Sequence, residues 1–285
     1  MSDTRAIGIF DSGVGGMTVV HEVFKKLPRE DVVYFGDTAR VPYGTKSPRV
    51  VQLFALQDVC FLLKQNVKVL VAACHTVSSV ALEPLIQHFH LPILGVVEPG
   101  INAALKATRN NRIGVIGTRA TILSETYEKK LKEKREGVTV ISQPCPLFVP
   151  FAEEGWIEGE VITKVARTYL GPLQRQKIDT LILGCTHYPL LKSVIQHVVG
   201  EGVTIVDSAE EIASLLKTRL KVLGMENTEE RTPHHQFFVS DIPHQFKEVG
   251  ERFLGKPLTS VTRVDLESIQ LENEEEMCRF SCGFR

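Results

Sequence analysis

The stretch Val69-Leu-Val-Ala-Ala-Cys-His-Thr76 decides how the fold of this chain is interpreted. Its first five residues are all apolar, which is typical of a strand buried on both faces of a parallel sheet. Cysteine, histidine and threonine follow at the point where a helix is expected to begin. The stretch therefore predicts a buried strand that ends on reactive side chains.

A second copy of this pattern lies further along the chain. Thr180-Leu-Ile-Leu-Gly-Cys-Thr-His187 matches it, and Ile113-Gly-Val-Ile-Gly-Thr118 matches Ile7-Gly-Ile-Phe-Asp-Ser12 at a similar offset. Matches in the same order at similar offsets indicate an internal duplication. Apolar segments alternate with helical ones, as in β-α-β units with parallel strands. We therefore predict an α/β protein with two pseudo-symmetric, flavodoxin-like parallel-sheet domains that face each other across a cleft.

The expected elements follow from the same alternation. We predict strands at 7–10, 32–35, 67–73, 93–97, 112–116, 138–142, 180–184 and 204–206, and helices at 51–64, 121–134, 159–169 and 190–199. A helix at 209–223, a strand at 236–240 and a helix at 246–254 are expected to pack back onto the first half. The predicted domains are therefore residues 1–97 with 207–285, and residues 98–206. The glutamate-rich tail after Leu271 is expected to be poorly ordered.

Composition limits the classes of partner. The 285 residues carry a net charge of −1, which does not favour a nucleic-acid partner. No apolar segment approaches the ~20 residues of a membrane span, and no secretory signal is visible. Six cysteines without such a signal are typical of reduced thiols, so we expect a cytoplasmic protein. A homodimer is one expected assembly.

Cys74 and Cys185 carry the predicted chemistry. Each follows a buried strand and precedes a helix, at the sheet edge where open α/β sheets bind ligands. A helix dipole there favours the thiolate. If the two halves face each other, the thiols approach one atom from opposite sides, which suits inversion of a C–H stereocentre. The remaining cysteines lack this context and are expected to be packing or incidental residues: Cys60, Cys145, Cys278 and Cys282.

Other polar residues are expected to line the same cleft. Asp11 ends the first strand and suits either a substrate ammonium or a helix cap. The glycine-rich segment after it departs from a dinucleotide fingerprint, because Thr18 occupies the third glycine position. Pro42-Tyr-Gly44 lies on the loop after the second strand, and Glu153 lies on an expected loop at 148–155.

These segments resemble the aspartate/glutamate racemase superfamily, and within it the bacterial glutamate racemases. The resemblance spans roughly residues 5–255 and rests on segments 8–16, 36–44, 73–76, 146–150 with Glu153, 183–189, 238–241 and 253–255. It implies racemisation of L-glutamate to D-glutamate for peptidoglycan and cell-wall synthesis, without pyridoxal phosphate or metal. It also implies Cys74 and Cys185 as the base and acid pair, assisted by Asp11, Glu153 and His187. The implied substrate-binding residues are Asp11, Ser12, Tyr43, Gly44, Thr76, Thr186 and His187, and we add His75 to them as a prediction of our own.

His75 departs from the resemblance, because the family usually has asparagine after the first cysteine. An imidazole also offers an N–H group, and when protonated it adds a positive charge beside the substrate carboxylate. We therefore hypothesise a substrate contact that titrates. The alternative is that His75 turns away and forms a local hydrogen bond.

Two other interpretations remain open at this stage. The same fold could racemise aspartate or carry out a related thiol-dependent decarboxylation, although decarboxylation needs only one proton donor. The glycine-rich loop could instead belong to a non-catalytic module that binds a nucleotide or a partner.

Overall fold

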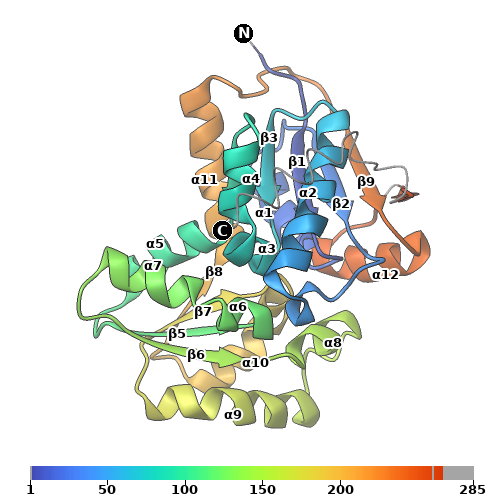
Figure 1. Cartoon of the computed structure of the whole chain (residues 1–285). Helices are drawn as coiled ribbons and strands as arrows, with labels where there is room; N and C mark the ends of the chain where they lie inside the picture. The colour runs from blue at the N-terminus through green and yellow to red at the C-terminus, as the bar shows by residue number, and fades with distance from the viewer. Residues whose placement is uncertain (1, 259, 266–285) are drawn as a thin grey trace.

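The computed structural model describes residues 2–258 and 260–265. The expected disordered tail, with Cys278 and Cys282, lies outside the described residues. Two parallel sheets form the two halves, the first above and the second below in Figure 1. The strand order is β10-β9-β2-β1-β3-β4 in the first sheet and β6-β5-β7-β8 in the second. The first four strands of each half therefore share one order, which fits the duplication inferred from the sequence.

The first half alternates strands and helices as predicted. Its strands are β1 (Ile7–Asp11), β2 (Val32–Gly36), β3 (Val69–Ala72) and β4 (Ile93–Gly95). Its helices are α1 (Met17–Lys26), α2 (Pro48–Lys64), α3 (His75–Val80) and α4 (Leu82–His88), with the short 3₁₀ turn η1 (Tyr43–Thr45). All residues of β1, β2 and β3 are buried, which explains their almost continuous apolar sequences.

The second half follows the linking helix α5 (Val97–Ala107). Its strands are β5 (Arg112–Gly117), β6 (Thr139–Pro144), β7 (Thr180–Gly184) and β8 (Thr204–Asp207). Its helices are α6 (Arg119–Leu123), α7 (Thr126–Lys134), α8 (Phe148–Glu153), α9 (Glu160–Arg175) and α10 (Lys192–Val199), and η2 (Tyr188–Leu191) precedes α10.

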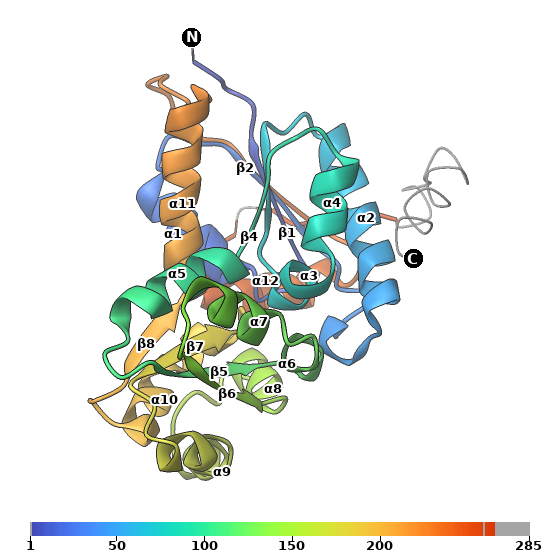
Figure 2. The same ribbon diagram turned by 60° about the vertical axis from the view of Figure 1, so that its left-hand side comes forward.

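The chain then returns to the first half. Helix α11 (Ser208–Leu223) packs against α1 and α5, as Figure 2 shows. Strand β9 (His235–Val239) pairs with β2, β10 (Thr262–Arg263) pairs with β9, and α12 (Pro243–Leu254) packs against α1. The expected return of the C-terminal segment is thus observed, while the exact domain limits stay a prediction. Within the described residues, no helix is both long and apolar enough to cross a membrane.

Two segments differ from their predicted form. The expected helix 121–134 is interrupted between α6 and α7, where Glu125 has a φ of 56° and the Ser124 hydroxyl accepts a hydrogen bond from the Thr126 N–H. Local hydroxyl–backbone bonds of this kind compete with helical ones. The expected loop 148–155 is largely the helix α8, because Phe148 and Ala152 are buried on one side of it.

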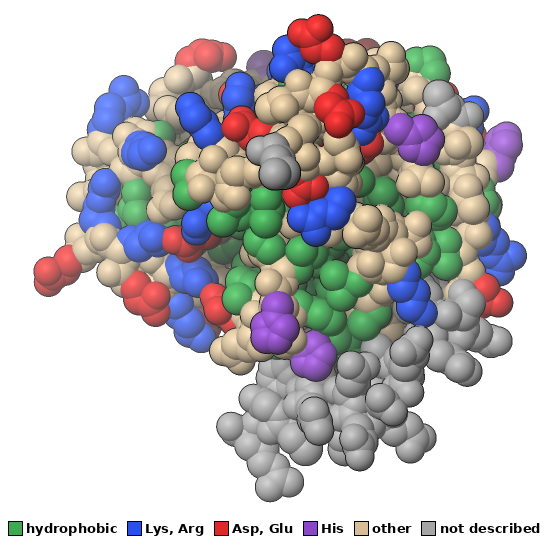
Figure 3. Space-filling model, turned by 90° about the horizontal axis from the view of Figure 1, so that it is seen from above, with side chains coloured by type: hydrophobic (Ala, Val, Ile, Leu, Met, Phe, Trp, Pro, Cys, Tyr) green, Lys and Arg blue, Asp and Glu red, His purple; other side chains and the backbone are tan. Residues whose placement is uncertain are grey.

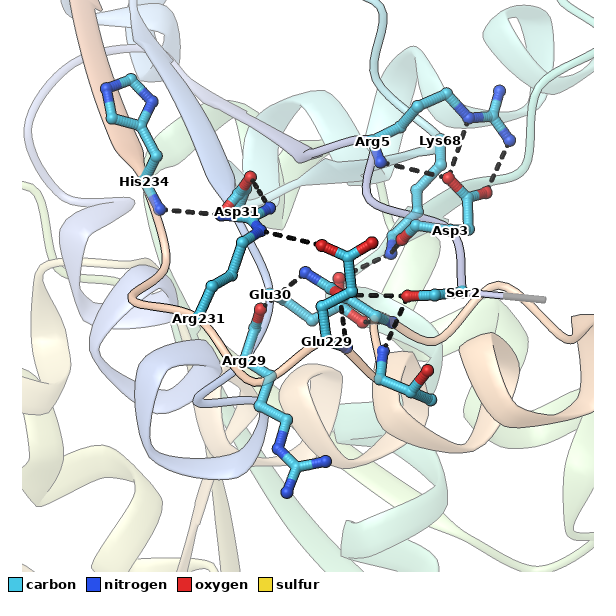
Figure 4. Close-up of polar contacts among 12 residues, drawn as sticks. Ser2, Asp3, Arg5, Arg29, Glu30, Asp31, Lys68, Glu229, Arg231 and His234 are labelled. Atoms are coloured by element: carbon cyan, nitrogen blue, oxygen red, sulfur yellow. Dashed lines mark hydrogen bonds and ion pairs between the residues drawn. The ribbon is translucent and has the colours of Figure 1, made fainter.

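A polar network holds the end of the first half that is remote from the second sheet. The Lys68 Nζ lies 2.6 Å from Glu30 Oε2 and donates to the carbonyl of Asp3. Glu30 Oε1 accepts from the N–H of Asn227, so the buried pair joins the N-terminal segment to the chain after α11 (Figure 4). On the surface seen from above, acidic and basic side chains are intermixed (Figure 3).

We expect Lys68→Met to lower the free energy of unfolding by about 3–5 kcal/mol, because Glu30 keeps a buried charge without its partner. Lys132→Met is the matched control, since Lys132 lies at the same 2.6 Å from Glu128 on an exposed helix face. Its expected cost is below about 1 kcal/mol. Urea unfolding of both variants measures the difference. Equal costs would contradict the structural importance of the buried pair.

Candidate functional site

A small cavity of about 50 Å³ lies between the carboxyl ends of the two sheets. Ten of the sequence-predicted site residues line it: Ser12, Tyr43, Gly44, Cys74, His75, Thr76, Glu153, Cys185, Thr186 and His187. A larger groove of about 360 Å³ adjoins it and shares Gly13, Val41 and Glu153 with it. The cavity is smaller than the roughly 300–1,000 Å³ of typical sites for drug-sized ligands, so it suits a small substrate.

The two thiols reach the cavity from equivalent positions in the two halves. Cys74 lies one residue beyond the end of β3 and directly before α3, and Cys185 directly follows β7, which is the corresponding strand of the second sheet. Each cysteine is only 6% exposed. The two similar sequence segments of the duplication therefore place two thiols at the same cavity.

The surroundings of Cys74 favour its protonated form. Burial raises the pKa of the Cys74 thiol to about 12, and the nearby carboxylate of Asp11 acts in the same direction. The Cys74 Sγ lies 3.6 Å from the hydroxyl oxygen of Ser12. In the absence of substrate this thiol is therefore suited to donate a proton.

Cys185 lies beside a histidine and a carboxylate. The Cys185 Sγ is 3.8 Å from His187 Nδ1, and His187 Nε2 is 2.8 Å from Glu153 Oε1. Burial disfavours the imidazolium, but the contacts with Cys185 and Glu153 outweigh it and raise the pKa of His187 to about 10. The imidazole of His187 thus lies between the sulfur of Cys185 and the carboxylate of Glu153.

Asp11 connects the two halves beneath the cavity. Its Oδ2 accepts from the N–H of Gly13 at 3.0 Å, and its Oδ1 accepts from the Thr186 hydroxyl at 3.4 Å. Burial raises the pKa of Asp11, and the charge of His187 acts in the opposite direction. Asp11 does not cap α1, which begins after Gly16 with no side-chain cap. Its carboxylate instead contacts the backbone of its own glycine-rich loop and the hydroxyl of Thr186 in the second half.

The hydroxyl of Tyr43 is bound within the protein. It donates to Asp37 and lies 3.2 Å from Asp58, while Arg40 contacts both carboxylates. Burial and the charge of Asp37 raise the pKa of Asp58 well above its usual range, with Arg40 opposing them. This cluster fixes the loop that carries Gly44. A substrate contact from Tyr43 would have to use other atoms than its hydroxyl.

Sequence reasoning did not identify two threonines near the first thiol. The hydroxyl oxygens of Thr76, Thr118 and Thr121 lie within 3.0–3.2 Å of one another, and Thr118 also lines the cavity. The internal repeat offered a signal for one of them, because Thr118 occupies the position that corresponds to Ser12. Thr121 becomes visible only once the two halves are placed together.

His75 does not behave as hypothesised. It is 4% exposed, and among the described residues neither ring nitrogen has a hydrogen-bond partner. Burial lowers the pKa of His75 to about 3, so the imidazole is neutral at physiological pH. The hypothesis of a titrating contact is therefore wrong, and so is the alternative of a local hydrogen bond. Whether the neutral residue touches substrate stays a prediction.

Comparison with known proteins identifies the family to which the chain is similar. The Asp/Glu/Hydantoin racemase family model matches residues 10–216. A glutamate racemase from Geobacter metallireducens is 52% identical over 93% of this chain and 98% of its own length. One from Syntrophus aciditrophicus is 45% identical over the same shares.

Solved structures of glutamate racemases are similar to this chain in fold. Glutamate racemase isoform RacE1 from Bacillus anthracis has a TM-score of 0.89 at 42% identity, covering 93% of this chain and 98% of that one. The Francisella tularensis glutamate racemase, solved in complex with D-glutamate, has a TM-score of 0.87 at 40% identity, covering 93% and 99%. The match in sequence and in fold extends over nearly the whole chain, which therefore belongs to the Asp/Glu/hydantoin racemase family.

Proposed function

We propose that this racemase interconverts L- and D-glutamate with its two cysteines as base and acid. One observation carries the proposal: Cys74 and Cys185 line the same small cavity, each from the carboxyl end of its own sheet. Glutamate is favoured as substrate because the relatives at 45–52% identity are glutamate racemases, and one similar structure contains D-glutamate.

Each turnover moves two protons. A thiolate on one face takes the α-proton, and the electron pair of the broken C–H bond remains on the substrate as a carbanion. The thiol on the opposite face then gives its proton to the same carbon. One S–H bond forms and another breaks, so the configuration is inverted without a redox step.

The surroundings of the two thiols differ. Burial raises the pKa of Cys74 and favours its thiol form, whereas the Cys185 sulfur lies 3.8 Å from the Nδ1 atom of His187. Glu153 holds the imidazole of His187, and Asp11 holds the hydroxyl of Thr186. With Cys74 as the proton donor, Cys185 is the group that removes the α-proton from the opposite face. The reverse direction requires the protons to be exchanged first.

The two rival interpretations are less well supported. Aspartate racemase structures resemble this chain in fold, but at only 17–18% identity. The nucleotide-binding alternative conflicts with the glycine-rich loop, because a Cβ at Gly15 would lie 2.3 Å from Thr186 Oγ1. Protein atoms from the second half thus occupy the face that a phosphate would need.

The wider role stays a prediction. Supply of D-glutamate for peptidoglycan and independence from cofactors rest on the resemblance. The cytoplasmic location rests on the sequence composition, and assembly as a homodimer is untested.

Incubation with each enantiomer of glutamate and of aspartate tests the proposed activity. We expect circular dichroism to decay to zero for both glutamate enantiomers, because the two-thiol mechanism works from either face. The same assay with added chelator and without pyridoxal phosphate tests cofactor independence. If the circular dichroism decays with aspartate and not with glutamate, aspartate is the substrate and the proposal is contradicted.

Cys74→Ala and Cys185→Ala should each abolish net inversion, because each variant lacks the group on one face. Each should still exchange the α-proton of one enantiomer in deuterated water, and the two variants should act on opposite enantiomers. Proton NMR follows this exchange. Full racemisation by either variant would contradict the two-thiol mechanism.

His75→Asn should leave the pH dependence of kcat/KM for glutamate unchanged between pH 5.5 and 8.5, because the buried imidazole stays neutral there. In the parent protein the pKa of His75 is lower in the folded than in the unfolded state. The stability that the neutral imidazole contributes is therefore present above pH ~6.5 and declines as the pH falls towards 3. The variant should therefore lose less Tm than the parent between pH 7 and pH 4.5. A different kinetic profile would restore His75 as a titrating contact.

A further inference from the structure

The glycine-rich segment after β1 has no role yet in the proposed reaction. Its glycines Gly13, Gly15 and Gly16 are absent from the positive-φ glycines of the described chain, so backbone conformation does not require them. Space does. A Cβ at Gly15 would lie 2.3 Å from Thr186 Oγ1 and 2.5 Å from His187 Nδ1. The loop that carries Cys185 therefore packs closely against this glycine-rich segment.

Thr18 makes a polar contact between the two halves at this place. It is 6% exposed, and its hydroxyl lies 2.9 Å from the carbonyl oxygen of Gly15 and 3.1 Å from that of Thr186. A threonine early in a helix commonly bonds to a carbonyl of the preceding turn. The bond to Thr186 is different, because it joins residues that lie 168 positions apart in the two halves.

The backbone of the second loop explains why Thr186 needs this partner. The N–H groups of Tyr188 and Leu190 donate to the carbonyls of Cys185 and His187, respectively, in successive tight turns. The corresponding donor for the carbonyl of Thr186 would be residue 189, which is a proline without an N–H group. A buried carbonyl that lacks its donor is costly, and the Thr18 hydroxyl provides one.

We propose that Thr18 is a positioning residue for the Cys185 side of the reaction. By holding the peptide between Thr186 and His187, it sets where the imidazole and the thiol stand relative to the cavity. The expected effect on racemisation rests on the proposed function. The expected effect on the position of the Cys185 loop does not.

Thr18→Val keeps the shape of the side chain and removes the hydroxyl. We expect kcat for glutamate to fall about 10- to 100-fold, with a smaller change in KM, because misplacing a reacting group by a fraction of an ångström is costly. Thr18→Ser should recover most of the activity. Thr168→Val is the matched control, since the Thr168 hydroxyl donates to the carbonyl of Lys164 on an exposed helix face. It should leave kcat unchanged.

Proton exchange can assign the effect to one thiol. In the Cys74→Ala background only Cys185 remains, and Thr18→Val should slow its exchange of the α-proton. In the Cys185→Ala background the same substitution should have little effect. Equal slowing in both backgrounds would indicate a general structural role and overturn the proposal.

A chemical readout separates this inference from the proposed function. Iodoacetamide alkylates thiols, and mass spectrometry measures the rate at Cys74 and at Cys185 separately. We expect Thr18→Val to change the rate at Cys185 relative to that at Cys74, and Thr168→Val to leave the ratio unaltered. If the parent protein is inactive on glutamate, the proposed function fails while this ratio still tests Thr18. A ratio unaffected by Thr18→Val overturns the positioning role.

Discussion

Each cysteine-bearing segment, 74–76 in the first half and 185–187 in the second, packs against the opposite half, and this contact forms the cavity. The Cys185 loop rests on the glycine-rich segment after β1, where Gly15 leaves room for Thr186 and His187. The Cys74 loop meets the segment after β5 through hydroxyl contacts of Thr76 with Thr118 and Thr121. Each half therefore completes the site of the other. Neither sheet alone could enclose a cavity with a thiol on two sides.

Burial within this contact gives similar residues different properties. The fold is nearly symmetric, yet Cys74 adjoins the carboxylate of Asp11, whereas Cys185 adjoins the imidazole of His187. Burial and the charge of Asp11 both raise the pKa of Cys74, so this thiol keeps its proton. The Cys185 sulfur has an imidazole as its neighbour instead of a carboxylate. Inversion needs a base on one face and an acid on the other, so unlike neighbours for the two sulfurs suit it.

Much of the fold could be predicted from the sequence because its signals are local. The apolar strands, the repeated segments and the cysteine at the end of β3 and of β7 are all visible in short windows. The prediction was wrong at two places, for different reasons. At Glu125 a local hydroxyl–backbone bond competes with helix periodicity. In α8, burial of Phe148 within the core stabilises as a helix a segment whose sequence is typical of a loop.

The two thiols, their flanking threonines and histidines, and the duplicated sheets that carry them can all be recognised in the amino-acid sequence. The surroundings of each side chain follow from the three-dimensional fold, because they depend on neighbours that are distant in the chain. His75 and His187 are both histidines beside a thiol, but burial without partners lowers the pKa of one to about 3, and contacts with Cys185 and Glu153 raise that of the other to about 10. Thr18 likewise looks like a lost glycine in the sequence. It becomes a hydrogen-bond donor to the second half only when folding brings residues 18 and 186 together.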